Sequence, residues 1–256
     1  MLRPRIIPCL LIHNNGLVKS LRFTDYKYVG DPINAVKIFN EKEADELIVL
    51  DIDATAEGRE PNYKMIAHLA NECRMPLCYG GGVKTAAQAK QLVRLGVEKV
   101  AVSSAAIEQP DLIPRIADEV GRQSCVVVLD VRQTAGGAYE VFTHNGRKAT
   151  GREPVAFARE LAKVGAGEIV VNSIDRDGVM KGYDVPLARR LKDSIDVPIS
   201  VLGGAGTLDH VRELISACGV IGAAAGSMFV FKGSLRAVLI NYPPESRKNE
   251  VFAAAG

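Results

Sequence analysis

The sequence predicts an α/β protein of one domain, a (β/α)8 TIM barrel with an internal half-barrel repeat. Three observations carry this prediction. Short runs rich in Val, Ile and Leu alternate with helix-like amphipathic patterns along the chain. The runs lack the apolar–polar alternation of strands covered on one side only, so they fit parallel strands that helices cover. Two stretches of the chain also resemble each other at an offset of about half its length.

The expected strands begin at eight places. These lie near residues 5, 46, 75, 98, 125, 168, 197 and 220. Between them, segments such as TAAQAKQLVRLG at 85–96 have the pattern of amphipathic helices that open on a Thr cap and end at a Gly. A chain of 256 residues has the usual size of such a barrel. The alternative, an open doubly wound sheet, seldom repeats in two equal halves.

The internal repeat pairs two strands and the turns that follow them. ELIVLDID at 46–53 aligns with EIVVNSID at 168–175, and MPLCYGGG at 75–82 aligns with VPISVLGG at 197–204. Both alignments share one offset, as duplication of a four-strand unit would produce.

The repeat also sets the expected domain organisation. We expect a single domain over 1–256, with halves at about 1–122 and 123–240. The remaining segment, 241–256, carries no readable pattern, and we expect it to be a frayed tail.

Composition excludes several classes of function. A net charge of +2 and only 5% aromatic residues do not indicate nucleic-acid binding. No apolar run reaches the length of a membrane span, and the opening MLRPRIIPCLLI leads into no cleavage site, so we expect the first strand of a cytoplasmic protein. Cysteines and histidines lack the spacings of disulfide frameworks or metal sites, so we expect no metal. They are Cys9, Cys73, Cys78, Cys125, Cys218, His13, His68, His144 and His210.

Two irregular segments, 13–31 and 132–152, each follow an expected strand. This order places them on the barrel face where catalytic loops lie. Within the second segment, Asn145 and Gly146 predict the tight turn of a small hairpin. Loops of this length are commonly lids, and we expect the first to be a mobile loop.

A Gly-rich turn follows the strand expected near residue 75, at Gly81 and Gly82. Bare backbone N–H groups there can approach an anion, although one such turn is as readily a connection that binds nothing. Recurrence at Gly203 and Gly204 favours two phosphate cradles, and small residues end the next strand in each half. Those small residues are Ser103, Ser104, Gly226 and Ser227. The pattern predicts an elongated substrate with a phosphate at each end.

Three further side chains are candidates for the same site. Asp130 ends the apolar run CVVVLD, where partial desolvation would raise its pKa for general acid–base work, although a strand-end Asp is often structural. Asp177, beside Gly178, is either a ligand contact or an ordinary turn residue. Lys19, in the first loop, either folds over an anion or is a solvated surface lysine.

Four charged residues stand at strand starts, at the opposite end of the expected barrel. They are Arg5, Glu46, Lys99 and Glu168. Two positive and two negative charges would form a neutral ring that closes the barrel floor. The alternative is that each is merely solvated, as charges at strand starts commonly are.

Ordered motifs along the chain resemble those of the cyclase subunit of imidazole glycerol phosphate synthase. They are RIIPCL, Lys19, GDP, ADELIVLDI, EGRE, PLCYGGGVK, KVAVSSAA, GAGEI, SIDRDG, GYD and GGAG. The likeness runs from residue 2 to about 232. It implies a (β/α)8 barrel that needs no cofactor and converts a bisphosphorylated formimino ribotide.

The resemblance also implies a partner. A glutaminase subunit docked on the barrel floor would release ammonia, which passes a charged gate and travels through the barrel. By resemblance, Asp130 falls on a catalytic carboxylate, Lys19 on the loop lysine, and the two cradles on the two phosphate sites. The gate positions are those of Arg5, Glu46, Lys99 and Glu168.

One departure from the family pattern concerns the chemistry. The family carries a second catalytic carboxylate at the end of the first strand, where this chain has Leu11. Loss of one partner of such a pair commonly costs about 10² to 10⁴ in rate. Asp53, where the family usually has a small hydroxyl residue, is the only candidate substitute. Ser103 stands where the family usually has Asn. The family's first loop begins with charged residues, and this chain has His13, Asn14 and Asn15 there.

Three hypotheses of function follow. The first is a cyclase-type subunit of a glutamine amidotransferase complex, with Asp130 as the acid–base catalyst, forming imidazole glycerol phosphate as in histidine biosynthesis. The second, motivated by Leu11, is a variant copy that passes ammonia to another acceptor. Resemblance suggests a sugar amidotransferase that makes acetamidino sugars for surface lipopolysaccharide. The third is a scaffold that only activates its glutaminase.

Overall fold

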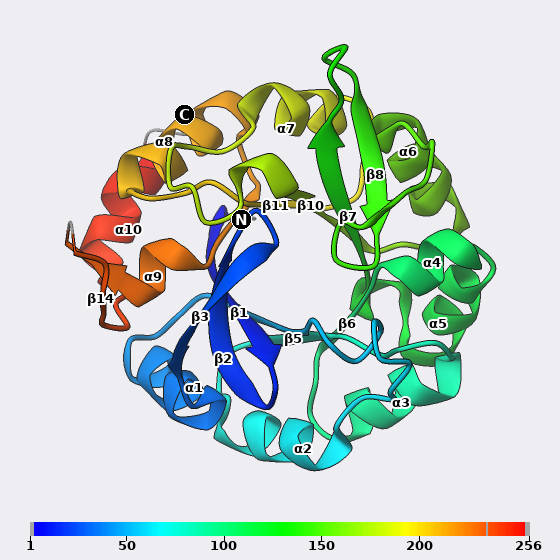
Figure 1. Ribbon diagram of the computed structural model, residues 1–256, viewed down its shortest axis with the longest axis horizontal. Coiled ribbons are helices and arrows are strands. Elements are labelled where there is room, and N and C mark those ends of the chain that lie inside the picture. Colours follow the sequence, from blue (N-terminus) through cyan, green and yellow to red (C-terminus); the bar gives the residue numbers. More distant parts are fainter. Residues whose placement is uncertain (1–2, 234, 254–256) are drawn as a thin grey trace.

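The computed structural model describes residues 3–233 and 235–253. Eight parallel strands close into a barrel, each hydrogen-bonded to the next and the last to the first. In barrel order they are β1 (Arg5–His13), β4 (Leu47–Asp51), β5 (Leu77–Gly80), β6 (Lys99–Val102), β7 (Cys125–Gln133), β10 (Glu168–Ser173), β11 (Ile199–Leu202) and β12 (Gly222–Ala225). The expected (β/α)8 barrel is therefore confirmed, and Figure 1 shows the helices ringing it.

Helices cover the outside of the barrel between successive strands. They are α1 (Pro32–Glu41), α2 (Tyr63–Glu72), α3 (Ala86–Arg94), α4 (Ser104–Glu108), α5 (Leu112–Val120), α6 (Pro154–Val164), α7 (Val185–Lys192), α8 (Leu208–Cys218) and α9 (Ser227–Val230), with 3-10 turns at Arg122–Ser124 and Ile174–Arg176. The Thr cap expected for the helix after Gly82 is confirmed, because Thr85 and Gln88 form a reciprocal capping box at α3. None of the described helices is long and apolar enough to cross a membrane.

Side chains inside the barrel belong to every second residue of each strand. A compact apolar cluster fills the interior, and a larger one packs the strands against the helices. The interior cluster comprises Ile7, Cys9, Ile48, Cys78, Ala101, Val126, Val128, Val170, Leu202 and Ala224, with Leu11 and Leu50 packed on it. This alternation puts polar residues at both ends of an apolar column, as on β10, where Val170 lies between Glu168 and Asn172.

The segment 13–31 is not the irregular loop that we expected. It folds into an antiparallel ribbon of β2 (Gly16–Leu21) and β3 (Thr24–Gly30) that continues β1. Asn14 and Asn15 have φ values of 50° and 62°, and this left-handed pair makes the tight turn that joins twisted strands. The sequence Asn-Asn-Gly is therefore a hairpin signal that the loop prediction overlooked.

The hairpin expected in 132–152 is present. β7 extends past the barrel and pairs with β8 (Tyr139–Thr143), which pairs in turn with β9 (Lys148–Ala149). The turn after β8 includes Asn145 and Gly146, both at positive φ. In Figure 1 this hairpin and the β2–β3 ribbon both lie on the face that carries the carboxyl ends of the barrel strands.

The prediction of a frayed tail after residue 240 was wrong for the described residues. α10 (Glu245–Phe252) packs beside α8. Tyr242 is buried and its hydroxyl donates to the carbonyl oxygen of Ile6 at 2.8 Å. Lys248 is 3% exposed, and its Nζ lies 2.8 Å from Oδ1 of Asp45. The segment is short and carries many charged residues, so its sequence did not indicate a helix. The buried ion pair between Lys248 and Asp45 anchors this helix.

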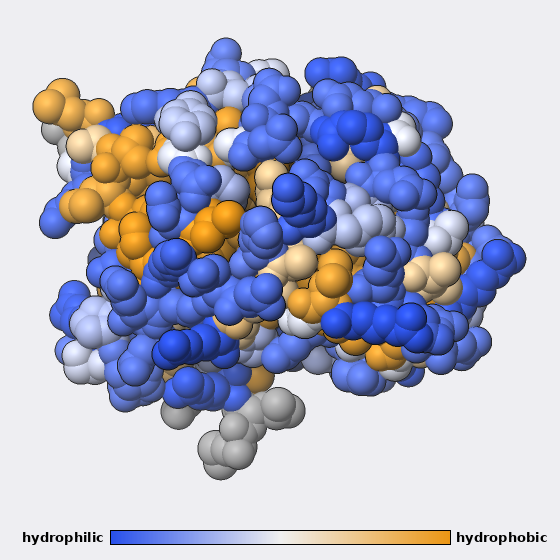
Figure 2. Space-filling model, turned by 90° about the horizontal axis from the view of Figure 1, so that it is seen from below, coloured by the Kyte–Doolittle hydropathy of each residue, from blue (hydrophilic) through white to orange (hydrophobic). Residues whose placement is uncertain are grey.

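Most of the surface is hydrophilic, as Figure 2 shows for one side of the molecule. Its orange patch at the upper left lies at the short hairpin of β13 (Phe231–Lys232) and β14 (Ala237–Val238). Leu235, Val238 and Leu239 are exposed there.

Candidate active site

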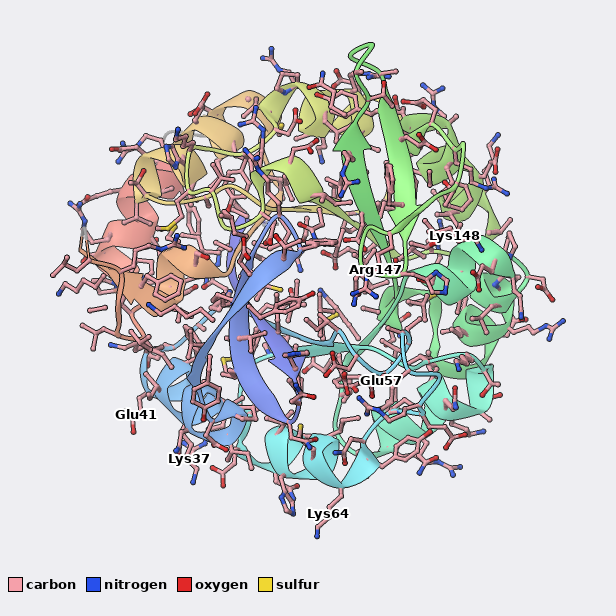
Figure 3. The ribbon with its side chains drawn as sticks, viewed as in Figure 1. Lys37, Glu41, Glu57, Lys64, Arg147 and Lys148 are labelled. Atoms are coloured by element: carbon pink, nitrogen blue, oxygen red, sulfur yellow. The ribbon has the colours of Figure 1, made fainter. Side chains whose placement is uncertain are left out.

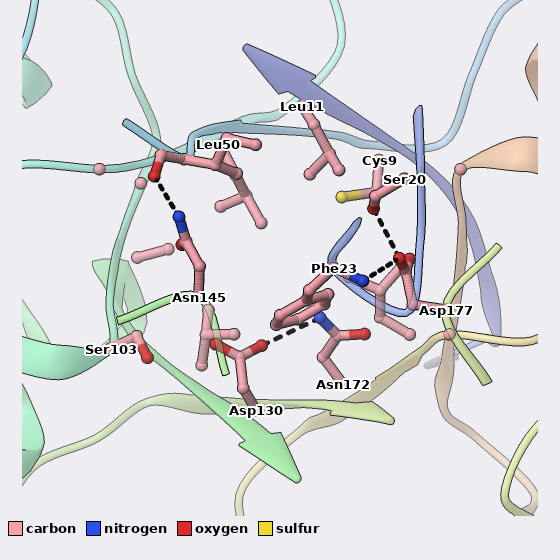
Figure 4. Close-up of a pocket in the computed structure, with 18 of the residues that line it drawn as sticks. Cys9, Leu11, Ser20, Phe23, Leu50, Ser103, Asp130, Asn145, Asn172 and Asp177 are labelled. Atoms are coloured by element: carbon pink, nitrogen blue, oxygen red, sulfur yellow. Dashed lines mark hydrogen bonds between the residues drawn. The ribbon is translucent and has the colours of Figure 1, made fainter. Parts of the chain in front are cut away.

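One pocket opens at the carboxyl ends of the barrel strands (Figure 4). Every residue that the sequence assigned to the substrate site lines it. These residues are Lys19, Gly81, Gly82, Ser103, Ser104, Asp130, Asp177, Gly178, Gly203, Gly204, Gly226 and Ser227. The structure therefore brings the candidates together, while the role of each stays a prediction. Among the described residues, no group of three or more His, Cys, Asp or Glu is placed to hold a metal ion.

The two Gly-rich turns lie at the ends of β5 and β11, on opposite sides of the barrel order. Gly81 and Gly204 have φ values of +122° and +106°. A Cβ at Gly81 would lie 2.4 Å from the carbonyl oxygen of Asp51, and one at Gly204 would lie 2.1 Å from that of Gly182. Only glycine fits both this backbone angle and this space. Each strand therefore turns sharply toward the helix that follows it, and no side chain covers the backbone at the turn.

Small residues complete each Gly-rich turn. Ser103 and Ser104 lie where β6 passes into α4, and Gly226 and Ser227 lie where β12 passes into α9. Because β5 neighbours β6 and β11 neighbours β12, each half contributes two adjacent strand ends without bulky side chains. The half-barrel repeat thus produces two similar openings around one pocket.

Asp130 lies on the wall of the pocket formed by β7. Nδ2 of Asn172, its neighbour in register on β10, donates to Oδ1 of Asp130 at 3.0 Å. Desolvation raises the pKa of Asp130 to about 7, and the charge of Asp177 adds to the rise while the bond from Asn172 opposes it. A carboxyl group with a pKa near neutrality can both accept and donate a proton in the ordinary pH range.

Asp177 and Lys19 join the ribbon to the pocket. The hydroxyl of Ser20 donates to Oδ2 of Asp177 at 2.6 Å, so the loop after β10 is tied to β2. Lys19 is only 4% exposed, and its Nζ donates to the carbonyl oxygen of Cys9 at 2.5 Å. Burial lowers the pKa of Lys19. Lys19 is therefore not a solvated lysine: β2 holds its ammonium group inside the pocket, beside Gly226.

An apolar wall faces Asp130. Figure 4 shows Leu11 and Leu50 on the side of the pocket opposite Asp130 and Asn172. Asp53 does not line the pocket. It accepts from Nδ1 of His13 at 2.7 Å and from the backbone N–H of Asn14 at 2.8 Å, so both of its oxygens brace the turn between β1 and β2. The suggestion that Asp53 replaces the absent carboxylate was wrong.

The four strand-start charges meet at the barrel floor. Arg5 bonds to both Glu46 and Glu168, and Lys99 does the same, with Nζ 2.8 Å from an oxygen of each glutamate. The two glutamates are 3% and 4% exposed. Burial raises the pKa of Glu168, but the charges of Arg5 and Lys99 outweigh it and hold that pKa well below its ordinary value. The ring is thus neutral, closed and ionised.

Several pocket residues escaped the sequence analysis. Asn172 is a polar residue inside the apolar run EIVVNSI, a signal that could have found it. Phe23 and Tyr26 reach the pocket from the ribbon, which the loop prediction concealed. Arg147, on the turn after β8, does not line the pocket, but Figure 3 shows it directed toward the barrel axis, whereas Lys148 beside it lies further out.

Fold and pocket together define a class: a (β/α)8 barrel of two similar halves with its ligand pocket at the carboxyl ends of the strands. A family model described as "Histidine biosynthesis protein" matches residues 5–236. The chain belongs to this histidine biosynthesis family.

Curated relatives cover nearly the whole chain. A Leptospira borgpetersenii protein, provisionally named imidazole glycerol phosphate synthase subunit HisF, is 55% identical over 253 residues, 98% of this chain and 100% of the relative. A Vibrio vulnificus relative, provisionally named subunit hisF3, is 54% identical over 98% of this chain and 97% of its own length. A Pseudomonas aeruginosa relative, provisionally named subunit hisF2, is 51% identical over 95% and 97%.

Proposed function

We propose that the chain is the cyclase-type subunit of an imidazole glycerol phosphate synthase-type complex, using ammonia from a partner glutaminase to convert a bisphosphorylated formimino ribotide to imidazole glycerol phosphate. One observation carries the proposal. A closed ring of charges at the floor and a polar pocket at the mouth lie at the two ends of a single apolar barrel interior. The names of the relatives agree with it.

Ammonia is small and neutral, so an apolar interior can pass it while excluding ions. The interior side chains between the ring and the pocket are aliphatic or thiol groups without charge. The ring would admit ammonia when Lys99 swings away. Both cations contact the two glutamates, but the ammonium group of Lys99 is a point charge on a flexible stem, whereas the planar guanidinium of Arg5 also contacts Ser200. The glutaminase would dock on this floor.

At the mouth, the two Gly-rich turns would hold the two phosphates, with the ammonium group of Lys19 beside the second. Asp130 would act as the proton-transfer group, because its pKa lies near neutrality. Leu11 supplies no second carboxylate, so a single residue would serve the acid and base roles in turn.

Turnover of the formimino ribotide by the purified chain with excess ammonium salt at alkaline pH tests the proposal, since free ammonia bypasses the glutaminase. We expect imidazole glycerol phosphate to form, and Asp130→Asn to abolish its formation. Leu11→Asp should increase the rate, because it supplies the second carboxylate. No product from folded protein, with or without Leu11→Asp, would refute the cyclase assignment.

Leu11 favours a second candidate function. A complete ring of charges at the floor, together with a pocket that has only half of its acid–base pair, suits a subunit that passes ammonia to another acceptor, such as a sugar amidotransferase. The numbered names of the Vibrio and Pseudomonas relatives are those of additional copies of a subunit and agree with this reading. It predicts that Lys99→Ala or Glu168→Ala abolishes amidination of a sugar by the assembled complex. Glutaminase activation without any transfer would instead indicate a scaffold.

A further inference from the structure

The two halves of the pocket differ in charge. Lys19 is the one lysine or arginine among the described residues that line the pocket, and three aspartates line it as well. The ammonium group of Lys19 belongs to the second half, because a Cβ at Gly226 would lie 2.7 Å from its Nζ. A phosphate group carries about 1.5 to 2 negative charges at pH 7. A ligand with a phosphate at each end therefore needs a second cation, on the side of Gly82 and Ser104.

The half-barrel repeat indicates where that cation should come from. β1 and β7 each begin one half, extend past the barrel and pair with an antiparallel strand at the mouth. β1 neighbours β12, the last strand of the second half, and its ribbon places Lys19 at the end of β12. β7 neighbours β6, the last strand of the first half, and the turn after β8 contacts the end of β6. The counterpart of Lys19 should therefore lie on the turn after β8.

Three contacts hold that turn at the first half of the pocket. The backbone N–H of His144 donates to Oγ of Ser104 at 3.2 Å, and Nδ2 of Asn145 donates to the carbonyl oxygen of Ile52 at 2.9 Å. Gly146 lies against the tip of the ribbon, since a Cβ there would be 3.2 Å from an aromatic ring of the β2–β3 turn. The backbone of the turn is thus fixed to segments that follow β4 and β6, both of the first half.

Arg147 is the cation that this turn carries toward the mouth. Its side chain is directed toward the barrel axis, whereas that of Lys148 lies further out (Figure 3). Burial raises the pKa of the Tyr26 hydroxyl and the charge of Arg147 opposes this rise, so the guanidinium lies near a residue that lines the pocket. No described residue forms a hydrogen bond or an ion pair with that guanidinium, whereas Nζ of Lys148 lies 3.4 Å from Oε1 of Glu108.

Other arginines around the mouth already have carboxylate partners. They are Arg59 beside Glu57, Arg132 beside Asp175 and Arg176 beside Asp184. A guanidinium without such a partner can turn to a phosphate, whose oxygens match its parallel N–H donors. Among these arginines, Arg147 is the one whose charge a ligand can take up without breaking an ion pair.

We propose that Arg147 binds the phosphate at the first Gly-rich turn, as the counterpart of Lys19 at the second. This inference rests on the proposed phosphate sites, but not on which reaction follows. The ligand class is a molecule with a phosphate at each end, one end meeting Lys19 and the other meeting Arg147. Because Arg147 stands at the edge of the pocket rather than in its wall, its side chain turns toward Ser104 when the ligand binds.

Nuclear magnetic resonance with inorganic phosphate reports on the two halves separately. The backbone amides of Gly82 and Gly204 are followed while sodium phosphate is added to the full chain at constant ionic strength, with sodium chloride as the control salt. In Arg147→Met, we expect the Kd reported by Gly82 to rise about tenfold and the Kd reported by Gly204 to stay within about twofold. Lys19→Met should show the opposite pattern.

Two further variants separate a phosphate contact from a general effect of charge or folding. Arg147→Lys keeps the charge without the planar fork and should restore most of the affinity at Gly82. Lys148→Met removes the neighbouring cation, which lies further out, and should leave both Kd values unchanged.

The outcomes distinguish this inference from the proposed function. Equal affinity at Gly82 in the wild type and in Arg147→Met would overturn the role of Arg147 and leave the phosphate sites in place. Equal weakening at both glycines would also overturn it, because it would indicate a field over the whole pocket rather than a contact in one half. If phosphate shifts neither glycine in the wild type, the two phosphate sites are refuted and the role of Arg147 falls with them.

Discussion

Removal of Lys99 from the floor ring should destabilise the fold through the charges it leaves behind. In Lys99→Met, Glu46 and Glu168 keep Arg5 as their remaining charged partner in the ring, and the ring gains a net negative charge. Removing one partner of a buried ion pair lowers the free energy of unfolding by about 3–5 kcal/mol. The side chain of Lys99 is 18% exposed, so water reaches the ring and we expect the lower end of that range.

The same reasoning predicts that a second change partly repairs the first. Glu46→Gln alone should also destabilise, because it leaves an excess positive charge. The double variant Lys99→Met/Glu46→Gln is neutral and keeps the pair between Arg5 and Glu168, so it should cost less than the sum of the single changes by about 1–3 kcal/mol. Urea unfolding at pH 7 measures all three, and additivity within about 0.5 kcal/mol would refute the account of the ring.

Acid should narrow the difference between wild type and Lys99→Met. The depressed pKa of Glu168 contributes stability that is present above its ordinary value of 4.5 and is lost as pH falls through the lower, folded-state pKa. Without Lys99 that pKa rises, so the variant has less of this stability to lose. Lys90→Met serves as the control, because Lys90 pairs with Glu119 on the exposed surface and should cost no more than about 1 kcal/mol at either pH.

Three further predictions concern the pocket and the tail. If Asp130 acts first as a base, the rate should fall as pH drops through about 7, and Asp130→Asn should lose about 10² to 10⁴ in kcat, which a pH–rate profile would show; a profile flat from pH 5 to 9 would contradict this role. Gly204→Ala should weaken inorganic phosphate binding measured by calorimetry and lower the melting temperature, because its Cβ would overlap the carbonyl of Gly182; unchanged affinity would remove Gly204 from the phosphate site. Tyr242→Phe should cost about 1–2 kcal/mol in urea unfolding, because the hydroxyl of Tyr242 bonds to two backbone groups; no loss would mean that these two hydrogen bonds add nothing to stability.

Much of the fold could be predicted because it depends on local signals. Unbroken apolar runs, Thr and Pro at helix starts, and Gly at strand ends are readable one segment at a time. Alternation within a strand also carries a residue such as Asp130 to the mouth, and parallel strands bring strand ends together. For that reason every glycine and serine assigned to the site lines the pocket.

What the sequence concealed depends on contacts between distant segments. The exposed strand β3 of the ribbon carries charged and aromatic residues, a composition that resembles a loop. The sequence left open whether Lys19 folds over an anion or is solvated, because only the pairing of β2 with β1 turns its side chain inward. The tail was misread because Lys248 and Asp45 are 203 residues apart in the chain.

The central claim is that ammonia passes from the floor to the pocket inside the barrel. The most direct test supplies glutamine labelled with 15N in its side-chain amide, together with excess unlabelled ammonium salt, to the chain in complex with the glutaminase that co-purifies with it. The account predicts that 15N enters the product far beyond its share of the free ammonia. A product with the isotopic composition of the bulk ammonia would contradict passage through the barrel.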